Sequence, residues 1–394
     1  MAARPLIRLN PHQERRLKAG HPWAYSNEIR MTPELRGLTP GLPVRLEGDD
    51  GWRGGTFAFN PHSLIAARLL DRDPEAAIDG DWIRRRIAAA AALRARVADR
   101  RFHRLVHAEA DGLPGLVVDR YGEVAVVAAN SAWADGMTGE IVAALIAELG
   151  LAGVVGRNDS PVRELEGLPQ AVALLAGQAG RVAVEEGGLR FGIDLMAGQK
   201  TGWFFDQRRN RDMVAALAAG ARVLDAFCHL GAFGLRCAAA GATSVTLIDS
   251  SAAALAGATE AAAENGLAGR VAMRRGDALE AMAEAGQAGE RYDIVVCDPP
   301  AFAKSRKDQA AGLRAYGRMA RLAARLVAPG GLLFVASCSY HAPLEAFAAA
   351  VAEGLHRARR EGRVLATTGA GPDHPVHPHL PESAYLKAQL IQLD

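Results

Sequence analysis

From about Lys200 onward, short apolar segments alternate with alanine-rich segments, and this rhythm limits the fold more than any other feature. The apolar segments read A-R-V-L-D-A-F, S-V-T-L-I-D, R-V-A-M-R-R-G-D, Y-D-I-V-V-C-D and Leu332–Ser337. They predict five strands, with helices opening at Phe233–Ala239 and spanning Ala252–Asn265. Such alternation predicts an α/β fold: a mainly parallel, doubly wound sheet with its site beyond the carboxyl ends of the strands.

The first 190 residues follow a different pattern. The segment L-P-V-R-L-E-G-D-D-G-W-R-G-G-T-F-A-F-N alternates apolar and polar positions around a turn, which predicts a hairpin in a β-rich region 1–72. Beyond it, we expect a helix at Arg84–Arg101, strands at G-L-V-V-D and V-A-V-V-A-A, a helix at Ile141–Leu149 and a hairpin on Gly187-Gly188. The sequence therefore predicts three domains: a β-rich domain 1–72, a small central α+β domain 73–190 and the doubly wound domain 191–394.

Composition excludes several classes of protein. No window approaches about 18 uninterrupted apolar residues, and the N-terminus lacks the apolar core of a signal peptide. The four cysteines have no paired zinc spacing, so we expect free thiols in a cytoplasmic protein. Prolines separate His374, His377 and His379, and no Cys or carboxylate cluster completes a ligand set, so we predict no metal site.

Charge is unevenly distributed along the chain. The net charge is +2, yet residues 1–105 hold 19 Lys+Arg against 12 Asp+Glu. A basic first quarter suits a polyanionic partner. Charge alone leaves open the alternative of an arginine-rich composition with solvated helix faces.

Aspartates mark the ends of four predicted strands: Asp225, Asp249, Asp277 and Asp298. A carboxylate after the second strand can accept both ribose hydroxyls, and one after the third can meet an adenine amino group. Gly231 and Gly234 follow the first strand, where glycine lets a ligand approach the backbone and a helix N-terminus offers free N–H groups. The spacing is not G-x-G-x-x-G, which disfavours a dinucleotide. Helix capping by Asp and Ser is the alternative interpretation of these carboxylates.

With the motif D-P-P-A-F, these features resemble class I S-adenosylmethionine-dependent methyltransferases. The segment K-T-G-W-F-F-D-Q-R-R-N-R is similar to the T-G-x-[YF]-x-D-Q-R segment of the RlmI family of large-subunit ribosomal RNA cytosine-5 methyltransferases. H-P-W-A-Y-S-N-E-I, F-N-P-H-S-L-I-A-A-R-L-L and D-H-P-V-H-P-H-L-P-E-S-A-Y-L-K also resemble that family, so the likeness covers nearly the whole chain.

The resemblance implies an RNA-binding PUA domain at the N-terminus, a central α+β domain and a Rossmann-like catalytic domain. It also implies 23S ribosomal RNA as the partner and allows a homodimer. S-adenosyl-L-methionine would then be held by Thr201, Gly202, Asp225, Phe227, Gly231, Asp249, Asp277 and Asp298. Cys228 and His229 stand where the family usually has Ser and Tyr, and we assign them to packing or to support of the site.

Two cysteines are candidates for the nucleophile. Cys297 lies inside the apolar run I-V-V-C, where a cysteine is more often a small core residue. Many RNA cytosine-5 methyltransferases carry a cysteine directly after the proline of the D-P-P motif, but here Ala301 follows Pro300. Cys338 follows the fifth strand and matches the family's catalytic cysteine, with a buried structural thiol as the alternative.

The resemblance assigns the D-P-P-A-F segment to the target base. Asp298 would hydrogen-bond the ring's nitrogen 3 and amino edge, and Phe302 would offer a stacking face unless it simply packs in the core. Pro299 and Pro300 would fix the backbone, and Lys304 completes the predicted substrate-binding set. Two rival functions remain at this point: a guanine ring-nitrogen methyltransferase, and a non-catalytic RNA-binding ribosome-assembly factor. Cys338 argues against the first, and the intact cofactor turn against the second.

Overall fold

The computed structural model describes residues 4–197 and 202–394, and these fall into two compact units. The first unit runs up to Val182 and includes Ile193–Phe205 and Pro372–Ser383. The second comprises Ala183–Gly192, Asp206–Gly371 and Ala384–Asp394. This grouping is coarser than the three domains that the sequence predicts, which therefore stay a prediction.

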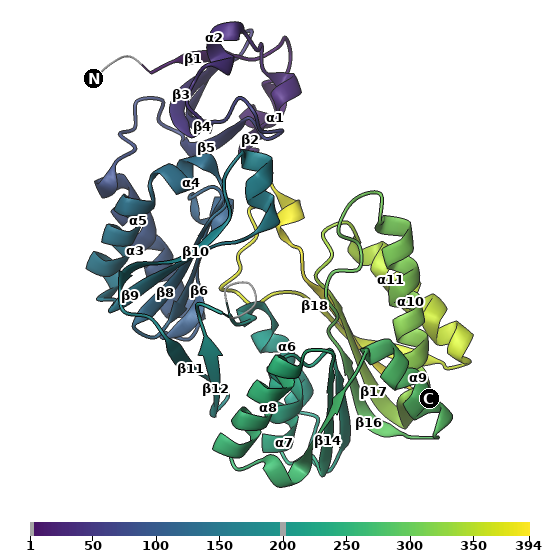
Figure 1. Cartoon of the computed structure of the whole chain (residues 1–394). Helices are drawn as coiled ribbons and strands as arrows, with labels where there is room; N and C mark the ends of the chain where they lie inside the picture. Colours follow the sequence, from purple (N-terminus) through teal and green to yellow (C-terminus); the bar gives the residue numbers. More distant parts are fainter. Residues whose placement is uncertain (1–3, 198–201) are drawn as a thin grey trace. The chain divides into compact units, whose positions relative to one another are not determined.

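The first unit begins with a five-stranded sheet in the order β1-β3-β4-β5-β2 (Figure 1). Val44 and Leu46 alternate inward along β3 and join Phe57 and Phe59 of β4 in one apolar core, as a half-buried antiparallel pair requires. The expected hairpin is therefore confirmed as β3 and β4. The elements are β1 (Leu6–Arg8), α1 (Arg15–Lys18), β2 (Trp23–Ala24), α2 (Pro33–Arg36), β3 (Leu42–Glu47), β4 (Arg53–Phe59) and β5 (Ala67–Asp71).

A second five-stranded sheet, in the order β10-β9-β8-β7-β6, completes the first unit with three helices. The predicted helix at Arg84–Arg101 is displaced, because Asp79 caps it earlier and the Asp99 side chain binds the N–H groups of Arg101 and Phe102 in a turn. The elements are α3 (Gly80–Val97), β6 (Phe102–His107), β7 (Leu116–Tyr121), β8 (Val124–Ala129), α4 (Ala132–Gly136), α5 (Thr138–Leu149), β9 (Gly153–Asn158) and β10 (Ala171–Gly177). The expected hairpin on Gly187-Gly188 is formed by β11 (Arg181–Glu186) and β12 (Leu189–Asp194).

The second unit is built on a seven-stranded sheet in the order β15-β14-β13-β16-β17-β19-β18. The first five strands of this order are parallel, and β19 runs antiparallel to both β17 and β18. This confirms the expected α/β fold class. The strands are β13 (Arg222–Ala226), β14 (Ser244–Asp249), β15 (Val271–Arg275), β16 (Tyr292–Cys297), β17 (Val327–Ser337), β18 (Gly362–Thr368) and β19 (Lys387–Leu393).

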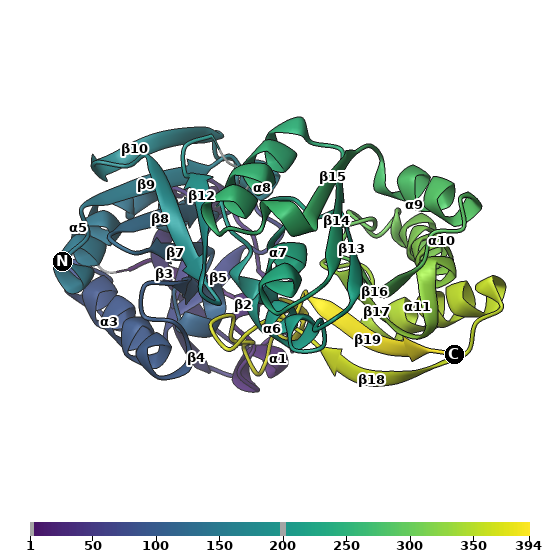
Figure 2. The ribbon, with the colours of Figure 1, turned by 90° about the horizontal axis from the view of Figure 1, so that it is seen from below.

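Helices cover both faces of this sheet. Figures 1 and 2 show α6, α7 and α8 on one face and α9, α10 and α11 on the other. The helices are α6 (Arg208–Ala215), α7 (Ala232–Ala239), α8 (Ala252–Glu264), α9 (Ala278–Gln287), α10 (Gln309–Leu326) and α11 (Leu344–Ala358). Such a sheet is buried on both faces, which explains why the central strands are nearly continuous apolar runs.

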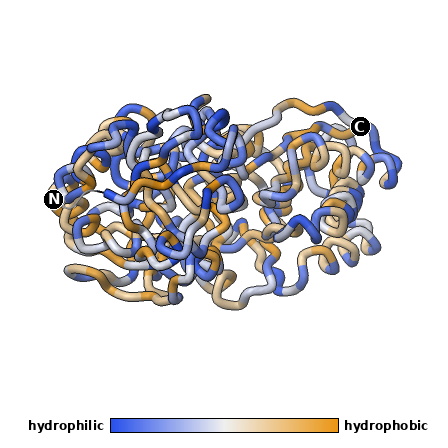
Figure 3. The backbone as a smooth tube through the Cα atoms, turned by 90° about the horizontal axis from the view of Figure 1, so that it is seen from above, coloured by the Kyte–Doolittle hydropathy of each residue, from blue (hydrophilic) through white to orange (hydrophobic). Residues whose placement is uncertain are grey.

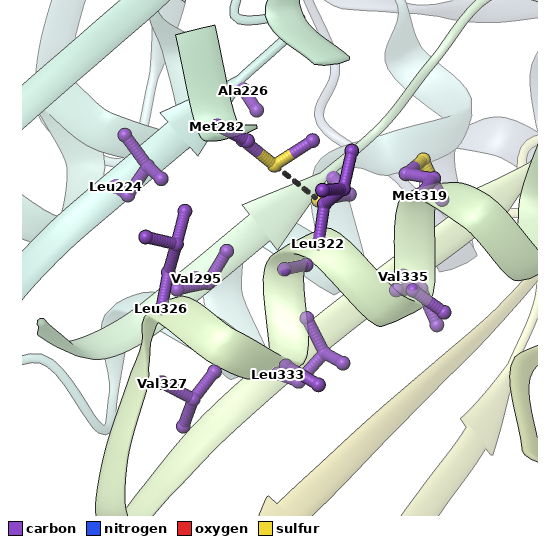
Figure 4. Close-up of a cluster of buried hydrophobic side chains, with 14 of the residues drawn as sticks. Leu224, Ala226, Met282, Val295, Met319, Leu322, Leu326, Val327, Leu333 and Val335 are labelled. Atoms are coloured by element: carbon purple, nitrogen blue, oxygen red, sulfur yellow. Dashed lines mark hydrogen bonds between the residues drawn. The ribbon is translucent and has the colours of Figure 1, made fainter. Parts of the chain in front are cut away.

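The core on the α9–α11 face joins Leu224 and Val295 of the sheet to Leu322 and Leu326 of α10 (Figure 4). Burial of this apolar surface holds the strand ends, and therefore the site, in fixed relative positions. Hydrophilic residues interrupt the apolar stretches along the chain in Figure 3. Among residues 4–197 and 202–394, no helix is both long and apolar enough to cross a bilayer.

Candidate active site at the carboxyl edge of the sheet

The turn between β13 and α7 has an uncommon backbone conformation. Phe227 and His229 have φ angles of 63° and 51°, which non-glycine residues rarely adopt. The turn is fastened to β14, because the N–H of Cys228 donates to the carbonyl of Ile248 at 3.0 Å and the N–H of His229 donates to Oδ2 of Asp249 at 2.9 Å. A strained turn held by its neighbour is typical of a binding site.

The glycines of this turn are required by packing. A Cβ on Gly231 would lie 2.6 Å from Cδ1 of Leu247, and one on Gly234 would lie 2.3 Å from Cδ2 of the same residue. Gly231 also has a φ of 73°. The glycines therefore bring α7 close to β14, and direct contact between Gly231 and a cofactor stays a prediction.

Asp225 is a buried carboxyl group that is only half satisfied. Its Oδ2 accepts the N–H of Gly234 at 2.9 Å, whereas its Oδ1 is buried and has no hydrogen-bond partner among the described residues. Burial raises the pKa of Asp225 to about 8, with the carboxylates of Asp298 and Asp249 acting in the same direction. Asp225 is therefore mainly neutral near pH 7, and a positively charged ligand beside it would favour its ionised form.

Asp249 and Asp277 both bind backbone N–H groups in the structure. Oδ1 of Asp249 accepts from Ser251 at 2.8 Å, in addition to the bond from His229, so the carboxylate is held at the end of β14. Oδ1 of Asp277 accepts from Leu279 at 2.9 Å and Glu280 at 3.0 Å, which makes Asp277 the N-cap of α9. Capping, the alternative interpretation, therefore describes Asp277, and its contact with an adenine stays a prediction.

Asp298 directly follows β16 and is oriented by a chain of polar side chains. Nε2 of Gln207 donates to Oδ1 of Asp298 at 2.8 Å, and Nδ2 of Asn210 donates to Oε1 of Gln207 at 2.6 Å. The hydroxyl of Thr368 donates to Oδ1 of Asn210 at 2.7 Å. Sequence reasoning assigned no role to Gln207 or Asn210, although both lie in the D-Q-R-R-N-R segment that carried the resemblance.

The residues after Asp298 are held by a buried hydroxyl cluster of Tyr316, Ser337 and Ser339. Oη of Tyr316 lies 2.8 Å from Oγ of Ser337 and 2.7 Å from Oγ of Ser339. Oγ of Ser339 accepts the N–H of Ala303 at 3.0 Å, which ties the D-P-P-A-F segment to the end of β17. The cluster therefore holds together the two segments that carry the predicted chemistry.

The predicted substrate residues differ in exposure. Pro299 is buried, whereas Pro300 and Lys304 are exposed. The ring of Phe302 lies 4.8 Å from that of Tyr316 and 6.3 Å from that of Phe227, measured between centroids. Phe302 thus takes part in core packing, and stacking of a base on its remaining surface stays a prediction.

The four cysteines, all in described segments, divide by exposure. Cys228, Cys237 and Cys297 are buried, and Cys338 is partly exposed. Sγ of Cys297 lies 3.9 Å from Sδ of Met282 within the apolar cluster of Figure 4, and burial raises the pKa of the Cys297 thiol above its usual value. A thiol in that state is a poor nucleophile, whereas Cys338 stands beyond β17 at the carboxyl edge.

The remaining residues that the sequence analysis singled out belong to the first unit or lie outside the described residues. Thr201 lies outside the described residues. Gly202 belongs to the first unit, where a Cβ would meet Ile193, Leu195 and Tyr121, and its contact with a cofactor stays a prediction. His374 belongs to the first unit too, and its Nδ1 lies 3.0 Å from Oδ1 of Asp373.

Two protein-family models match the chain, one in its N-terminal part and one in its C-terminal part. A model described as an S-adenosylmethionine-dependent methyltransferase matches residues 169–391. A model described as a PUA-like domain matches residues 7–72. These matches agree with the doubly wound sheet and with the N-terminal five-stranded sheet, respectively.

Curated relatives match the chain over nearly its whole length. A protein named ribosomal RNA large subunit methyltransferase I from Shewanella frigidimarina is 36% identical over 395 residues, which cover 98% of this chain and 99% of that protein. A protein of the same name from Pseudoalteromonas atlantica is 34% identical over 392 residues, with the same two coverages.

Solved structures share the fold. A putative S-adenosylmethionine-dependent methyltransferase from Streptococcus mutans has a TM-score of 0.84 at 21% identity, covering 98% of this chain and all of that one. A putative methyltransferase complexed with SAH also has a TM-score of 0.84, at 20% identity, covering 99% of this chain and all of that one. At these identities the likeness concerns the fold alone.

Proposed function

We propose, since the chain belongs to the ribosomal RNA large subunit methyltransferase I family of S-adenosylmethionine-dependent methyltransferases, that it methylates carbon 5 of a cytosine in 23S ribosomal RNA. Cys338 is the nucleophile in this proposal. The observation that carries it is the combination of partial exposure and position: Cys338 alone among the four described cysteines is not buried, and it lies at the carboxyl edge of the sheet.

The residues at this edge suit S-adenosylmethionine, which carries a sulfonium and an ammonium group. The buried Oδ1 of Asp225 has no described donor, so a cationic or hydrogen-bonding group of the ligand would satisfy it. Asp249, fixed at the end of β14, has lone pairs left for the ribose hydroxyls. When bound, the cofactor supplies an electrophilic methyl group.

Cys338 makes carbon 5 reactive. Its thiolate adds to carbon 6 of the cytosine, forming a carbon–sulfur bond and moving electron density onto carbon 5. After methylation, the carbon-5 proton is lost and the carbon–sulfur bond breaks, which returns the thiolate and restores the aromatic ring. The target base leaves its helix to enter the site, or is already unstacked.

Asp298 positions and polarises the ring during this sequence. Its carboxyl group would hydrogen-bond nitrogen 3 and the amino edge of the cytosine, and Gln207 holds its Oδ1 in one orientation. A base contact needs this preorganisation, because a freely rotating carboxylate would lose part of its binding energy to ordering.

The PUA-like region 7–72 would bind the ribosomal RNA, which accounts for the basic first quarter of the sequence. On the same grounds we place the protein in the bacterial cytoplasm, where ribosomal RNA is modified. A homodimer stays a prediction.

Mass spectrometry of 23S ribosomal RNA tests the proposal. RNA from a strain that lacks the gene should lose one 5-methylcytosine, and the wild-type gene should restore it. The Cys338→Ser gene should not restore it, since a hydroxyl gives almost no anion at neutral pH. Loss of a methylguanine instead would favour the guanine ring-nitrogen alternative, and no change in any methylated base would favour a non-catalytic factor.

A further inference from the structure

Lys387, the first residue of β19, is a buried lysine that binds a backbone carbonyl. Lys387 is 7% exposed, and its Nζ donates to the backbone carbonyl of Ser339 at 2.6 Å. Within the described segments, it forms no ion pair with a carboxylate at 4.0 Å or less. Lysines are almost never this buried unless paired, because an unpaired ammonium in the interior costs several kcal/mol. The buried ammonium of Lys387 therefore favours the anionic form of an ionisable group beside it.

The pairing of β19 with β17 brings Lys387 to the candidate nucleophile. The antiparallel register sets Lys387 opposite Ser337, and the carbonyl that it binds belongs to Ser339. Cys338 is the residue between these two serines. The lysine is thus attached to the backbone on both sides of Cys338, once by strand pairing and once by its own side chain.

The flanking serines point away from solvent. Both serine hydroxyls bind Tyr316 of α10 in a buried cluster, and Ser337 and Ser339 are each 0% exposed. Cys338 between them is partly exposed. The backbone of the S-C-S segment is therefore fixed by Tyr316 and Lys387, while the thiol keeps access to solvent.

We infer that Lys387 is a positioning residue whose ammonium stabilises the thiolate of Cys338. The inference rests on the proposed function, in which that thiolate attacks the base. The thiol proton passes to water, and the fixed positive charge lowers the free energy of the sulfur anion that remains. Ala301 follows Pro300 where many RNA cytosine-5 methyltransferases have a second cysteine, so Cys338 is the thiol that the charge of Lys387 stabilises.

Electrostatics around Cys338 agrees with this role. Burial lowers the pKa of Lys387, and the charge of Cys338 acts in the opposite direction, which is expected for a lysine beside a thiolate. Tyr316 of α10 is a titratable group bonded to this end of β17, and Asp298 follows β16, the parallel neighbour of β17. Tyr340 and His341 follow on the same segment as Cys338. Burial raises the pKa of the Tyr316 hydroxyl, so it is neutral near pH 7. Of Lys387, Tyr316 and Asp298, Lys387 is the group that carries a positive charge.

The pH dependence of alkylation by iodoacetamide tests the inference on the full-length protein. Residues 326–357, a tryptic peptide, contain Cys338 as their one cysteine, so mass spectrometry can follow this thiol alone. In Lys387→Gln, which keeps a donor for the carbonyl of Ser339 but removes the charge, the alkylation profile should move up by about one pH unit, roughly a tenfold slower reaction at pH 7. Lys387→Arg keeps the charge and should retain most of the wild-type profile. Lys307→Gln, which removes an exposed lysine between β16 and α10, should leave the profile unchanged.

An unchanged profile in Lys387→Gln would overturn the inference, as would an equal shift in Lys387→Arg, which would point to packing rather than charge. If Lys387→Gln does not fold, the reciprocal measurement uses the native lysine: by NMR, the pKa of Lys387 should be lower in Cys338→Ser than in wild type, and equal values would contradict the inference. Failure of the proposed function would give a different result from failure of this inference. In that case the alkylation shift would persist, while RNA containing 5-fluorocytosine would form no adduct with Cys338.

Discussion

Buried ionisable side chains are bonded differently around the second sheet of the first unit and at the carboxyl edge of the seven-stranded sheet. In the former, Arg94 binds Asp111 through two bonds of 2.6 and 2.7 Å, and Arg104 binds Asp119 through bonds of 2.5 and 3.1 Å. At the carboxyl edge, one oxygen of Asp225 has no described partner, and Lys387 has a carbonyl but no described carboxylate.

The difference separates charges that build the fold from charges kept for ligands. A bidentate arginine–carboxylate pair satisfies both partners and leaves nothing for a ligand to bind. A half-satisfied carboxyl group or an unpaired lysine costs stability in the free protein, and a ligand or a reaction intermediate can recover that cost. The predictions below test this separation, from the largest expected effect to the smallest.

Removal of a paired charge should cost the most. Arg94→Met leaves Asp111 buried without its cation, so the free energy of unfolding should fall by about 3–5 kcal/mol. Arg96→Met on the exposed side of the same helix is the matched control and should change stability by less than about 0.5 kcal/mol. Urea unfolding measures both, and equal effects would remove the structural role of the Arg94 pair.

Removal of a ligand-binding charge should instead reduce cofactor affinity. Asp249→Ala should weaken binding of S-adenosylmethionine by about 2–4 kcal/mol, because two charge-assisted hydrogen bonds to the ribose are lost. Asp277→Ala should have a smaller effect, since Asp277 is exposed and caps α9. Calorimetric titration that gave wild-type affinity for Asp249→Ala would exclude Asp249 from the site.

Asp225 should oppose folding in a pH-dependent way. Its pKa in the folded protein is raised to about 8, above the ordinary value near 4, so ionisation destabilises the fold increasingly between these two pH values. Asp225→Asn should therefore raise the free energy of unfolding by on the order of 5 kcal/mol at pH 8 and by little at pH 4, while weakening cofactor binding. A stability difference that does not depend on pH would contradict a buried neutral acid.

Surface arginines of the PUA-like region should each have the smallest effect. Arg15, Arg30 and Arg53 are exposed, whereas Arg16 is bound to Glu28 at 2.8 Å. Substitution of one RNA-contacting arginine by Ala should reduce the slope of log affinity against log salt by about 0.7–0.9. Point changes are preferable to deletion of residues 1–72, because Arg68 pairs with Glu109 and Glu166. The deletion would leave both of these carboxylates without their cation. Slopes unchanged in all three variants would leave the basic first quarter without a role in RNA binding.

Much of the second unit could be predicted from the sequence. The strands β13 to β16 are apolar runs that end near aspartates, and the structure begins and ends them within one or two residues of the prediction. The start of β17 was missed: the sequence predicted a strand from Leu332, whereas the strand begins at Val327 and runs through P-G-G at 329–331 with an irregular register. A local pattern cannot distinguish a turn from a bulge inside a strand.

The polar contacts of the site could not be predicted in the same way. Lys387 reaches Ser339 because β19 pairs antiparallel with β17, and Gln207 reaches Asp298 from a segment 91 positions earlier. Such contacts depend on register and packing between distant segments, and a sequence pattern does not contain them. Motif spacing identified Asp298 and Cys338, whereas Gln207 and Lys387 lie in segments that carried the resemblance but were given no role there.

The central claim is that Cys338, and not Cys297, attacks the base. The most direct test is a denaturing gel of the protein with target RNA that carries 5-fluorocytosine, because fluorine blocks the loss of the carbon-5 substituent and traps the covalent adduct. Wild type and Cys297→Ser should both form the adduct in the presence of S-adenosylmethionine, and Cys338→Ser should form none while still binding the cofactor. An adduct in Cys338→Ser, or its loss in a folded Cys297→Ser, would contradict the account.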